Sequence, residues 1–331
     1  MSEKLLTVSG LSVTYASGDR TVRAVNSVSL DINRGETLGL VGETGAGKTT
    51  FALSLMRLLP KRTAKITSGS VEFEGIDILS AGEDQMRSLR GDKIAMIFQD
   101  PMTSLDPVRT VGNQIGEALR LHSDNPHDRK AIESRVEEML ETVGIPATRK
   151  NEFPHQFSGG MKQRVLIAMA LSCSPELLIA DEPITALDVT IQAQVLALMG
   201  ELQERMQMAM LLITHDLGVV KHISDNVCVM YLGRQVELAP TAELFANPLH
   251  PYTRVLLSSI PVPNLDGRGR RREIIHGEVT SPIDPPDACR FCSRCPNAMN
   301  ICRESEPELR EAGHGHLVAC HLYDRKGQAD E

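Results

Sequence analysis

The chain has 331 residues, which is enough for one large domain with an appendage or for two domains. Lys and Arg total 35 against 43 Asp and Glu, and the net charge of −8 argues against a nucleic-acid partner. The sequence has no apolar run of the roughly 18 to 20 residues that a membrane-spanning helix needs, and its start lacks the features of a signal peptide. We therefore expect a protein without a transmembrane segment that is kept in the cytosol.

Residues 4 to 35 alternate apolar and polar side chains on both sides of Gly18-Asp19, which predicts antiparallel strands. Tyr15 belongs to the first of these strands. A tyrosine in a strand usually packs against its neighbours, but an aromatic ring near a nucleotide can also stack on the base. The sequence leaves both roles open for Tyr15.

The segment from Thr37 to Leu59 predicts a strand, a tight loop and a helix. Its loop fits the spacing G-x-x-x-x-G-K-S/T of a phosphate-binding loop, with the residues Gly42, Glu43, Thr44, Gly45, Ala46, Gly47, Lys48 and Thr49. Glycines allow positive φ and bring backbone N–H groups against phosphate oxygens. We expect Lys48 at the β- and γ-phosphates, the Thr49 hydroxyl on Mg²⁺, and the helix that continues through Thr50 with its dipole toward the same anion.

The apolar run from Lys93 to Phe98 predicts a buried strand that ends at Gln99. Gln99 therefore lies where a sheet opens into a loop, which is the edge at which open α/β sheets bind ligands. A glutamine in that place is also an ordinary loop residue. Beyond it, apolar residues recur at three- and four-residue steps from Val111 to Val143, with a polar interruption at 123–126, which predicts an inserted helical subdomain.

The helical part closes on Ser158-Gly159-Gly160, which precedes another helix. Ser158 is a good N-cap, and the two glycines leave backbone N–H groups at a helix start, so the motif is either a second anion-binding terminus or a simple cap. The following strand, Leu177 to Asp181, delivers two adjacent carboxylates to its end. Phosphoryl transfer needs such a pair, with Asp181 to hold Mg²⁺ and Glu182 to position and polarise the attacking water.

A helix is predicted after Asp188, and the strand from Met210 to Thr214 then places His215 at its tip. An isolated His-Asp pair is normally structural. At the end of a strand that neighbours the carboxylate pair, His215 is instead within reach of a γ-phosphate.

Together these motifs resemble the ATP-binding subunit of ABC transporters over residues 4 to 250, because they occur in that family's order and approximate spacing. The resemblance implies a P-loop α/β ATPase fold with an antiparallel β subdomain and an inserted helical subdomain at about 100–172, within a domain of residues 1–258. A small Cys-rich region is expected at 259–331.

The same resemblance assigns roles to single residues. Tyr15 stacks on adenine, Gln99 senses Mg²⁺ and the membrane partner, and Glu182 is the general base. Ser158, Gly159 and Gly160 bind the ATP that is held by the phosphate loop of a partner subunit. Asp181 joins Thr49 and Gln99 at Mg²⁺, and His215 contacts the γ-phosphate. The remaining ATP-site residues are Lys48 and Asp188.

The segments from Asp100 to Pro107 and from Asn247 to Thr253 look like those of the oligopeptide, dipeptide and nickel importer branch. The branch implies an ATPase that powers import of di- or oligopeptides, with nickel or another small solute as the alternative. The implied partners are a second ABC ATPase subunit, usually in a heterodimer, two transmembrane permease subunits and an extracytoplasmic substrate-binding protein, at the cytoplasmic face of the membrane. A non-transport ABC ATPase acting on nucleic acid or ribosomes, and a module that binds ATP but hydrolyses it poorly, are the alternatives from other classes.

A proline-rich segment with the basic run Arg268 to Arg272 predicts an irregular linker before the last fifth of the chain. Five cysteines follow it, at Cys289, Cys292, Cys295, Cys302 and Cys320. In a reducing cytosol such clustered thiolates suggest an iron–sulfur cluster or zinc before disulfides, and unliganded thiols are the third possibility. The branch pattern matches Cys289, Cys295, Cys302 and Cys320, and some members carry a four-iron, four-sulfur cluster, so the resemblance implies a structural [4Fe–4S] cluster with Cys292 as a substitute ligand or free thiol.

Overall fold

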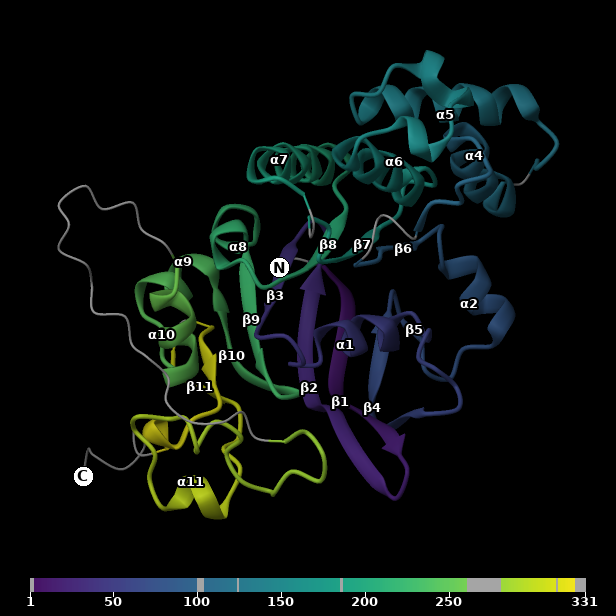
Figure 1. Cartoon of the computed structure of the whole chain (residues 1–331). Coiled ribbons are helices and arrows are strands. Elements are labelled where there is room, and N and C mark those ends of the chain that lie inside the picture. The colour runs from purple at the N-terminus through teal and green to yellow at the C-terminus, as the bar shows by residue number, and fades with distance from the viewer. Residues whose placement is uncertain are drawn as a thin grey trace, which may run out of the picture. The chain divides into compact units, whose positions relative to one another are not determined.

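The computed structural model describes residues 3–99, 104–123, 125–184, 187–260, 281–313 and 315–324 (Figure 1). The chain divides into two compact units, and each is described by itself. Unit 1 consists of Met1–Leu5, Ile32–Thr37 and Ile76–Ile213, and unit 2 of Leu6–Asp31, Leu38–Gly75 and Thr214–Glu331. The expected basic run at 268–272 and the first part of the branch-like segment, 100–103, lie outside the described residues.

Unit 1 is built on the parallel strands β6 (Ile94–Ile97), β7 (Leu177–Asp181) and β8 (Ala209–Thr214). Strand β7 pairs with β6 on one side and with β8 on the other. Every residue of β7 and β8 is buried, which explains why both read as unbroken apolar runs rather than as alternating strands.

The helices of unit 1 include three in succession, α4 (Val111–His122), α5 (Arg129–Thr142) and α6 (Gly159–Leu171), which contact one another. Side-chain caps begin all three, since Thr110, Asp128 and Ser158 each accept a hydrogen bond from a backbone N–H of the first turn. The predicted helical insertion is thus confirmed, including the polar break between α4 and α5. The other elements are β5 (Ile76–Asp77), α2 (Glu83–Leu89), α7 (Val189–Met206) and the short 3-10 helices η1 (Ala147–Asn151) and η2 (Pro154–Gln156).

Unit 2 contains the antiparallel strands that the alternation predicted, β1 (Lys4–Ser17), β2 (Arg20–Asn33) and β4 (Ala64–Phe73), in the order β2-β1-β4. Strands β1 and β4 run antiparallel, with Leu6 opposite Phe73. From Gly69 to Gly75 the sequence alternates apolar and polar residues, but β4 begins five residues earlier, at Ala64. Its first half is mostly exposed and polar, and therefore gives no apolar signal.

A second sheet of unit 2 pairs β3 (Thr37–Val41) with β9 (Asn226–Tyr231) in parallel, and β9 with β10 (Arg234–Pro240) antiparallel. The tail then adds β12 (Leu317–Val318) to β10 and β11 (Arg310–Glu311) to β12, the yellow strands of Figure 1. The sequence did not predict this pairing. The helices are α1 (Lys48–Leu55), α8 (Leu217–Ile223), α9 (Thr241–Ala246), α10 (Pro251–Ser258), α11 (Ile301–Glu304) and the 3-10 helix η3 (His321–Tyr323).

The core of unit 2 is continuous from strands β9 and β10 into the tail. Phe291 of the tail is 1% exposed and packs edge-on against Tyr231, with ring centroids 5.2 Å apart, and against Tyr252 at 5.5 Å. Glu237 of β10 is fully buried and accepts hydrogen bonds from the N–H groups of Leu249 and His250, at 2.7 and 3.0 Å. Across the described ranges, no helix has the length and apolarity to cross a membrane.

Candidate nucleotide site

The phosphate-binding loop of unit 2 joins β3 to α1 and has the backbone that its glycines predict. Gly45 and Gly47 have φ values of 83° and 96°, in the left-handed region. A Cβ on Gly47 would lie 2.2 Å from the carbonyl oxygen of Ala24, and one on Gly42 would lie 2.1 Å from that of Met230. Neither position can therefore accept a side chain. The first backbone N–H groups of α1 lie at the end of the loop.

Lys48 is the first residue of α1 and is buried, with 6% exposure. Its Nζ donates to the carbonyl oxygens of Gly42 at 2.7 Å and Glu43 at 3.2 Å, so the ammonium lies within the curve of the loop. The hydroxyl of Tyr15 is 3.4 Å from Oγ1 of Thr50, which places this half-buried tyrosine beside the first turn of α1. His215, also in unit 2, is exposed just after β8, and Asp216 next to it caps α8.

In unit 1 the carboxylate pair lies at the end of β7. Asp181 is the last strand residue and is 1% exposed, and Glu182 follows with φ 47°. Nε2 of Gln99 donates to Oε2 of Glu182 at 2.9 Å. The structure thus brings together two residues 83 positions apart that the sequence singled out separately. A left-handed backbone at a residue other than glycine costs free energy and is enriched at functional sites.

The serine–glycine motif begins α6, also in unit 1. Ser158 caps the helix by accepting from the N–H of Met161 at 3.4 Å, and Ser158 and Gly159 are exposed. A Cβ on Gly160 would lie 2.5 Å from Cγ2 of Ile191 on α7, so the packing of α6 against α7 favours glycine here independently of any ligand. Asp188 is exposed at the N-cap position of α7.

Sequence reasoning missed the contacts that α10 and the tail make with the phosphate-binding loop. The hydroxyl of Tyr252 accepts a hydrogen bond from the N–H of Glu43 at 2.9 Å, and Arg294 forms an ion pair with the Glu43 carboxylate at 3.0 Å. Both residues are far from the loop in the sequence, and no motif spacing connects them with it.

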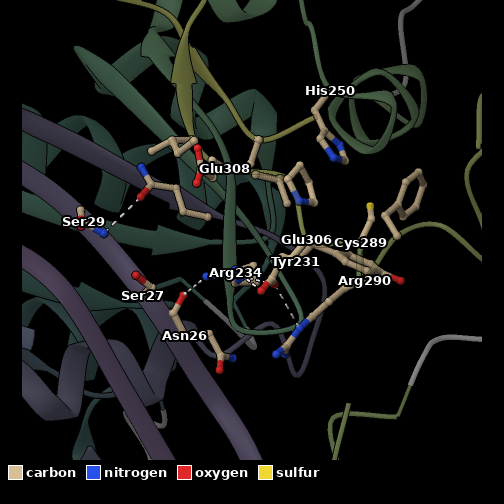
Figure 2. A pocket seen from close by; sticks show the side chains of 16 residues that line it. Asn26, Ser27, Ser29, Tyr231, Arg234, His250, Cys289, Arg290, Glu306 and Glu308 are labelled. Atoms are coloured by element: carbon tan, nitrogen blue, oxygen red, sulfur yellow. Dashed lines mark hydrogen bonds and ion pairs between the residues drawn. The ribbon is translucent and has the colours of Figure 1, made fainter. Parts of the chain in front are cut away.

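A cavity of about 420 Å³ lies in unit 2 between β2, the β9–β10 hairpin and the tail (Figure 2). Arg234 in its wall forms an ion pair with Glu306 and donates to the carbonyl oxygen of Asn26 at 3.2 Å. Another wall residue, Ser29, donates its N–H to Oε1 of Gln235 at 3.2 Å. These polar groups bond to each other across the cavity, so the cavity marks the place where the tail meets β2 and the β9–β10 hairpin.

All seven cysteines are free thiols. Burial, with neighbouring thiols as a smaller cause, raises the pKa of Cys289 to about 12 and that of Cys320 to about 11. Within the ranges that the structure describes, no group of three or more His, Cys, Asp or Glu residues is arranged to hold a metal ion. The predicted iron–sulfur cluster therefore gains no support from this geometry.

Comparison with known proteins gives two family matches and many relatives. The ABC transporter family model matches residues 25–185, and the model of the oligopeptide/dipeptide transporter C-terminal region matches residues 236–302. A probable peptide ABC transporter ATP-binding protein of Sinorhizobium fredii is 51% identical over 96% of this chain and 95% of its own length. A dipeptide transport ATP-binding protein of Bacillus subtilis is 46% identical over 98% of this chain and 97% of its own length.

Solved structures agree with these matches. A dimeric ATP-binding cassette in a post-hydrolysis state with ADP and phosphate superposes with a TM-score of 0.65 and 26% identity, over 72% of this chain and 99% of that one. A cassette from an ABC transporter complex of Clostridium perfringens gives a TM-score of 0.63 and 28% identity, over 74% of this chain and 92% of that one. From its phosphate-binding loop to its C-terminal region, the chain belongs to the family of ABC transporter ATP-binding proteins.

Proposed function

We propose that the chain hydrolyses ATP to power the import of di- or oligopeptides through an ABC transporter. The observation that carries the cargo class is the match of residues 236–302 to the oligopeptide/dipeptide transporter C-terminal region. Relatives whose names include peptide or dipeptide transport are similar over nearly the whole chain, which supports the same class. Nickel or another small solute is the competing cargo.

The proposed ATP site follows the residue roles that the family resemblance implies. Lys48 and the loop N–H groups bind the phosphates, and Tyr15 stacks on adenine. Mg²⁺ would be held by Thr49, Gln99 and Asp181 and would neutralise charge on the phosphate oxygens.

Glu182, oriented by its hydrogen bond from Gln99, accepts the proton of the attacking water. His215 contacts the γ-phosphate, and Asp188 lies near the same nucleotide. Ser158, Gly159 and Gly160 bind the nucleotide on the partner's loop, an arrangement that the dimeric state of a solved cassette supports.

ABC transporter membership implies a dimeric ATPase and permease subunits. We propose that the dimer is a heterodimer, that the chain binds two permease subunits at the cytoplasmic face of the membrane, and that an extracytoplasmic binding protein delivers the cargo. In this arrangement, nucleotide-driven closing and reopening of the two ATPase subunits alternates the access of the transport path.

Reconstitution of the chain with its companion ATPase, permeases and binding protein tests the cargo. We expect ATP-dependent uptake of labelled di- and oligopeptides into proteoliposomes and none without ATP. Uptake of nickel in place of peptides would contradict the cargo assignment. Co-purification with ribosomes or nucleic acid instead of membrane proteins would contradict transport itself.

For the tail, the resemblance and the five clustered cysteines support a [4Fe–4S] cluster, with zinc as the alternative, but the thiol arrangement does not. Iron and zinc analysis of anaerobically purified protein tests the proposal. Stoichiometric iron, with brown colour that is lost in Cys295→Ser, would support the cluster. A colourless protein with stoichiometric zinc would replace it with zinc, and a metal-free protein would end both proposals.

A further inference from the structure

Arg294 of the tail makes a two-point contact with the phosphate-binding loop, and both partners belong to unit 2. Its Nη1 donates to Oε2 of Glu43 at 3.0 Å and its Nη2 to Oε1 at 3.2 Å, so each carboxylate oxygen has its own donor. Nη1 also donates to the hydroxyl of Tyr231 at 3.1 Å. A bidentate arginine–carboxylate pair fixes orientation as well as distance.

Arg294 is shielded from solvent, whereas Glu43 is partly exposed. The Arg294 side chain is 10% exposed and that of Glu43 is 35% exposed. The guanidinium carbon lies 5.8 Å from the ring centroid of Tyr231 and 6.0 Å from that of Phe291. Shielded, well-aligned charge pairs interact more strongly than exposed ones, and removal of one partner leaves the other charge poorly compensated.

Glu43 connects this pair to the catalytic lysine of the loop. Its carbonyl oxygen accepts from Nζ of Lys48 at 3.2 Å and from the N–H of Ala46 at 3.1 Å. Its own N–H donates to the hydroxyl of Tyr252. The residue is thus held through its side chain, its N–H and its carbonyl, and a shift of Glu43 moves a carbonyl that contacts Lys48.

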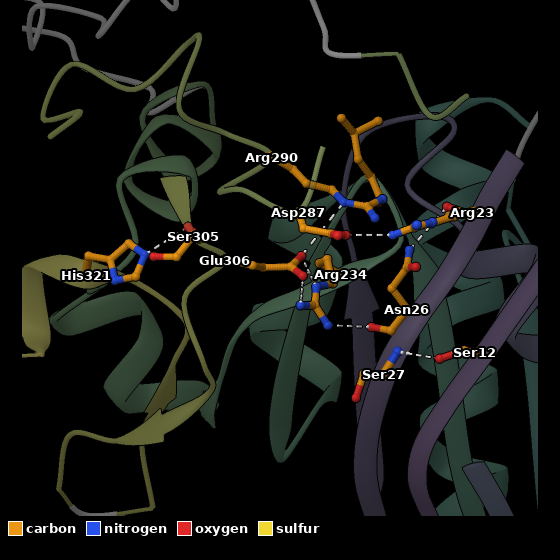
Figure 3. Close-up of polar contacts among 11 residues, drawn as sticks. Ser12, Arg23, Asn26, Ser27, Arg234, Asp287, Arg290, Ser305, Glu306 and His321 are labelled. Atoms are coloured by element: carbon orange, nitrogen blue, oxygen red, sulfur yellow. Dashed lines mark hydrogen bonds and ion pairs between the residues drawn. The ribbon is translucent and has the colours of Figure 1, made fainter. Parts of the chain in front are cut away.

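The part of the tail that carries Arg294 is itself fixed to the strands of unit 2. Figure 3 shows Asp287 paired with Arg23 of β2, and Glu306 paired with Arg234 of β10. Arg290 donates to the carbonyl oxygen of Leu232 in the β9–β10 turn. The segment that carries Arg294 is therefore held in place by these contacts. The N–H of Arg294 also donates to the carbonyl oxygen of Phe291 at 3.0 Å.

We propose that Arg294 is a positioning residue for the phosphate-binding loop: through Glu43 it fixes the loop in the shape that receives the nucleoside triphosphate. Arg294 lies in the turns between Cys292 and Cys295. The conformation of the cysteine-bearing turns thereby sets the affinity for MgATP, which gives the tail a function at the nucleotide. The inference rests on the proposed assignment of the loop as the ATP site.

Equilibrium binding of a fluorescent ATP analogue with Mg²⁺ to the full chain tests the inference. We expect Arg294→Gln and Glu43→Gln each to raise the Kd by about fivefold, somewhat less than the tenfold that 1.4 kcal/mol would give. In the double variant Arg294→Gln with Glu43→Gln the Kd should rise no further than in either single variant, because the effects of two residues in direct contact are not additive. Asp287→Asn is the matched control, because it removes another ion pair of the tail that does not contact the loop.

The transport complex supplies a second readout. If the loop binds the ground state and the transition state equally well, Arg294→Gln should raise the KM for ATP and leave kcat unchanged. Should this variant not fold, Arg294→Lys keeps the charge without the two-point geometry and should give a smaller increase in Kd.

Three results would overturn the inference: an unchanged Kd in Arg294→Gln, an equal loss in Asp287→Asn, or additive losses in the double variant. Failure of the unmutated chain to bind the analogue would instead refute the proposed ATP site. The two failures are therefore distinguishable.

Discussion

At the scale of single residues, the hydrogen bond from Gln99 allows the position of Glu182, the proposed catalytic carboxylate, to be tested apart from its basicity. In Glu182→Gln the amide oxygen still accepts from Gln99, but it takes no proton from water. We therefore expect ATP hydrolysis to fall by at least about 100-fold, with MgATP binding retained. Phosphate release and equilibrium binding measure the two properties, and a Mg²⁺-dependent rate equal to that of the unmutated chain would refute Glu182 as the base.

His250 gives a prediction about pH. Burial is the largest cause and lowers the pKa of His250 to about 4. The carboxylate of Glu237 acts in the opposite direction, and Arg254 makes a smaller contribution in the same direction as burial. The neutral ring is also required by the structure, because Nδ1 accepts from the N–H of Tyr252 at 3.0 Å and caps α10. The folded chain resists protonation of this ring, whereas the unfolded chain accepts a proton below a pKa of 6.5.

The contribution of His250 to stability is therefore complete above pH 6.5 and is lost as pH falls from 6.5 toward 4, by about 1.4 kcal/mol per unit and about 3 kcal/mol in all. Urea unfolding at several pH values measures the slope. His250→Asn keeps a capping oxygen and removes the titration, so its stability should depend less on pH over this window. Equal slopes in the two proteins would contradict this prediction.

At the scale of secondary-structure elements, the junction of α6 and α7 distinguishes two adjacent glycines. Gly160→Ala places a Cβ 2.5 Å from Cγ2 of Ile191 and should destabilise unit 1 by about 1–2 kcal/mol, as overpacking does. Gly159→Ala is the matched control, because its Cβ would lie 3.5 Å from Cδ2 of Leu187, an ordinary contact. Thermal unfolding compares the two, and equal melting temperatures would show that Ile191 moves aside without cost.

The elements that the sequence predicted are those with a local signal. The helices α4 and α5 have apolar spacing and N-caps, the strands β7 and β8 are apolar runs, and the loop before α1 has a fixed glycine spacing. The two-residue strands β11 and β12 were missed because they are too short for periodicity, and because β12 pairs with a strand about 80 residues away. The contact between Gln99 and Glu182 was also missed, because the two residues are far apart in the sequence and only the fold brings them together.

At the scale of the whole molecule, the tail covers an edge of the second sheet of unit 2. Strand β12 pairs with β10 through Glu237–Val318 and Leu238–Leu317. A chain that ends at residue 260 would leave this side of β10 unpaired and would remove Phe291 from the core. Unpaired edges and exposed apolar surface favour association.

We therefore expect the shortened chain to form soluble aggregates, measured by light scattering at equal concentration. A chain that ends at residue 324 keeps both tail strands and serves as the control. Monodisperse behaviour of the chain that ends at residue 260 would show that the tail is dispensable for the fold.

The buried carboxylate of Glu237 affects whether this tail can be transferred to another cassette. Besides the two N–H groups before α10, it is bonded to Nε2 of His316 in the tail at 2.7 Å. One acid thus joins the hairpin, the start of α10 and the tail. In a chimera that carries this tail on a cassette with an apolar residue in place of Glu237, the imidazole of His316 and the two backbone N–H groups would lose this carboxylate as their buried hydrogen-bond partner. Recombination between such genes should therefore succeed only where the crossover carries the hairpin together with the tail.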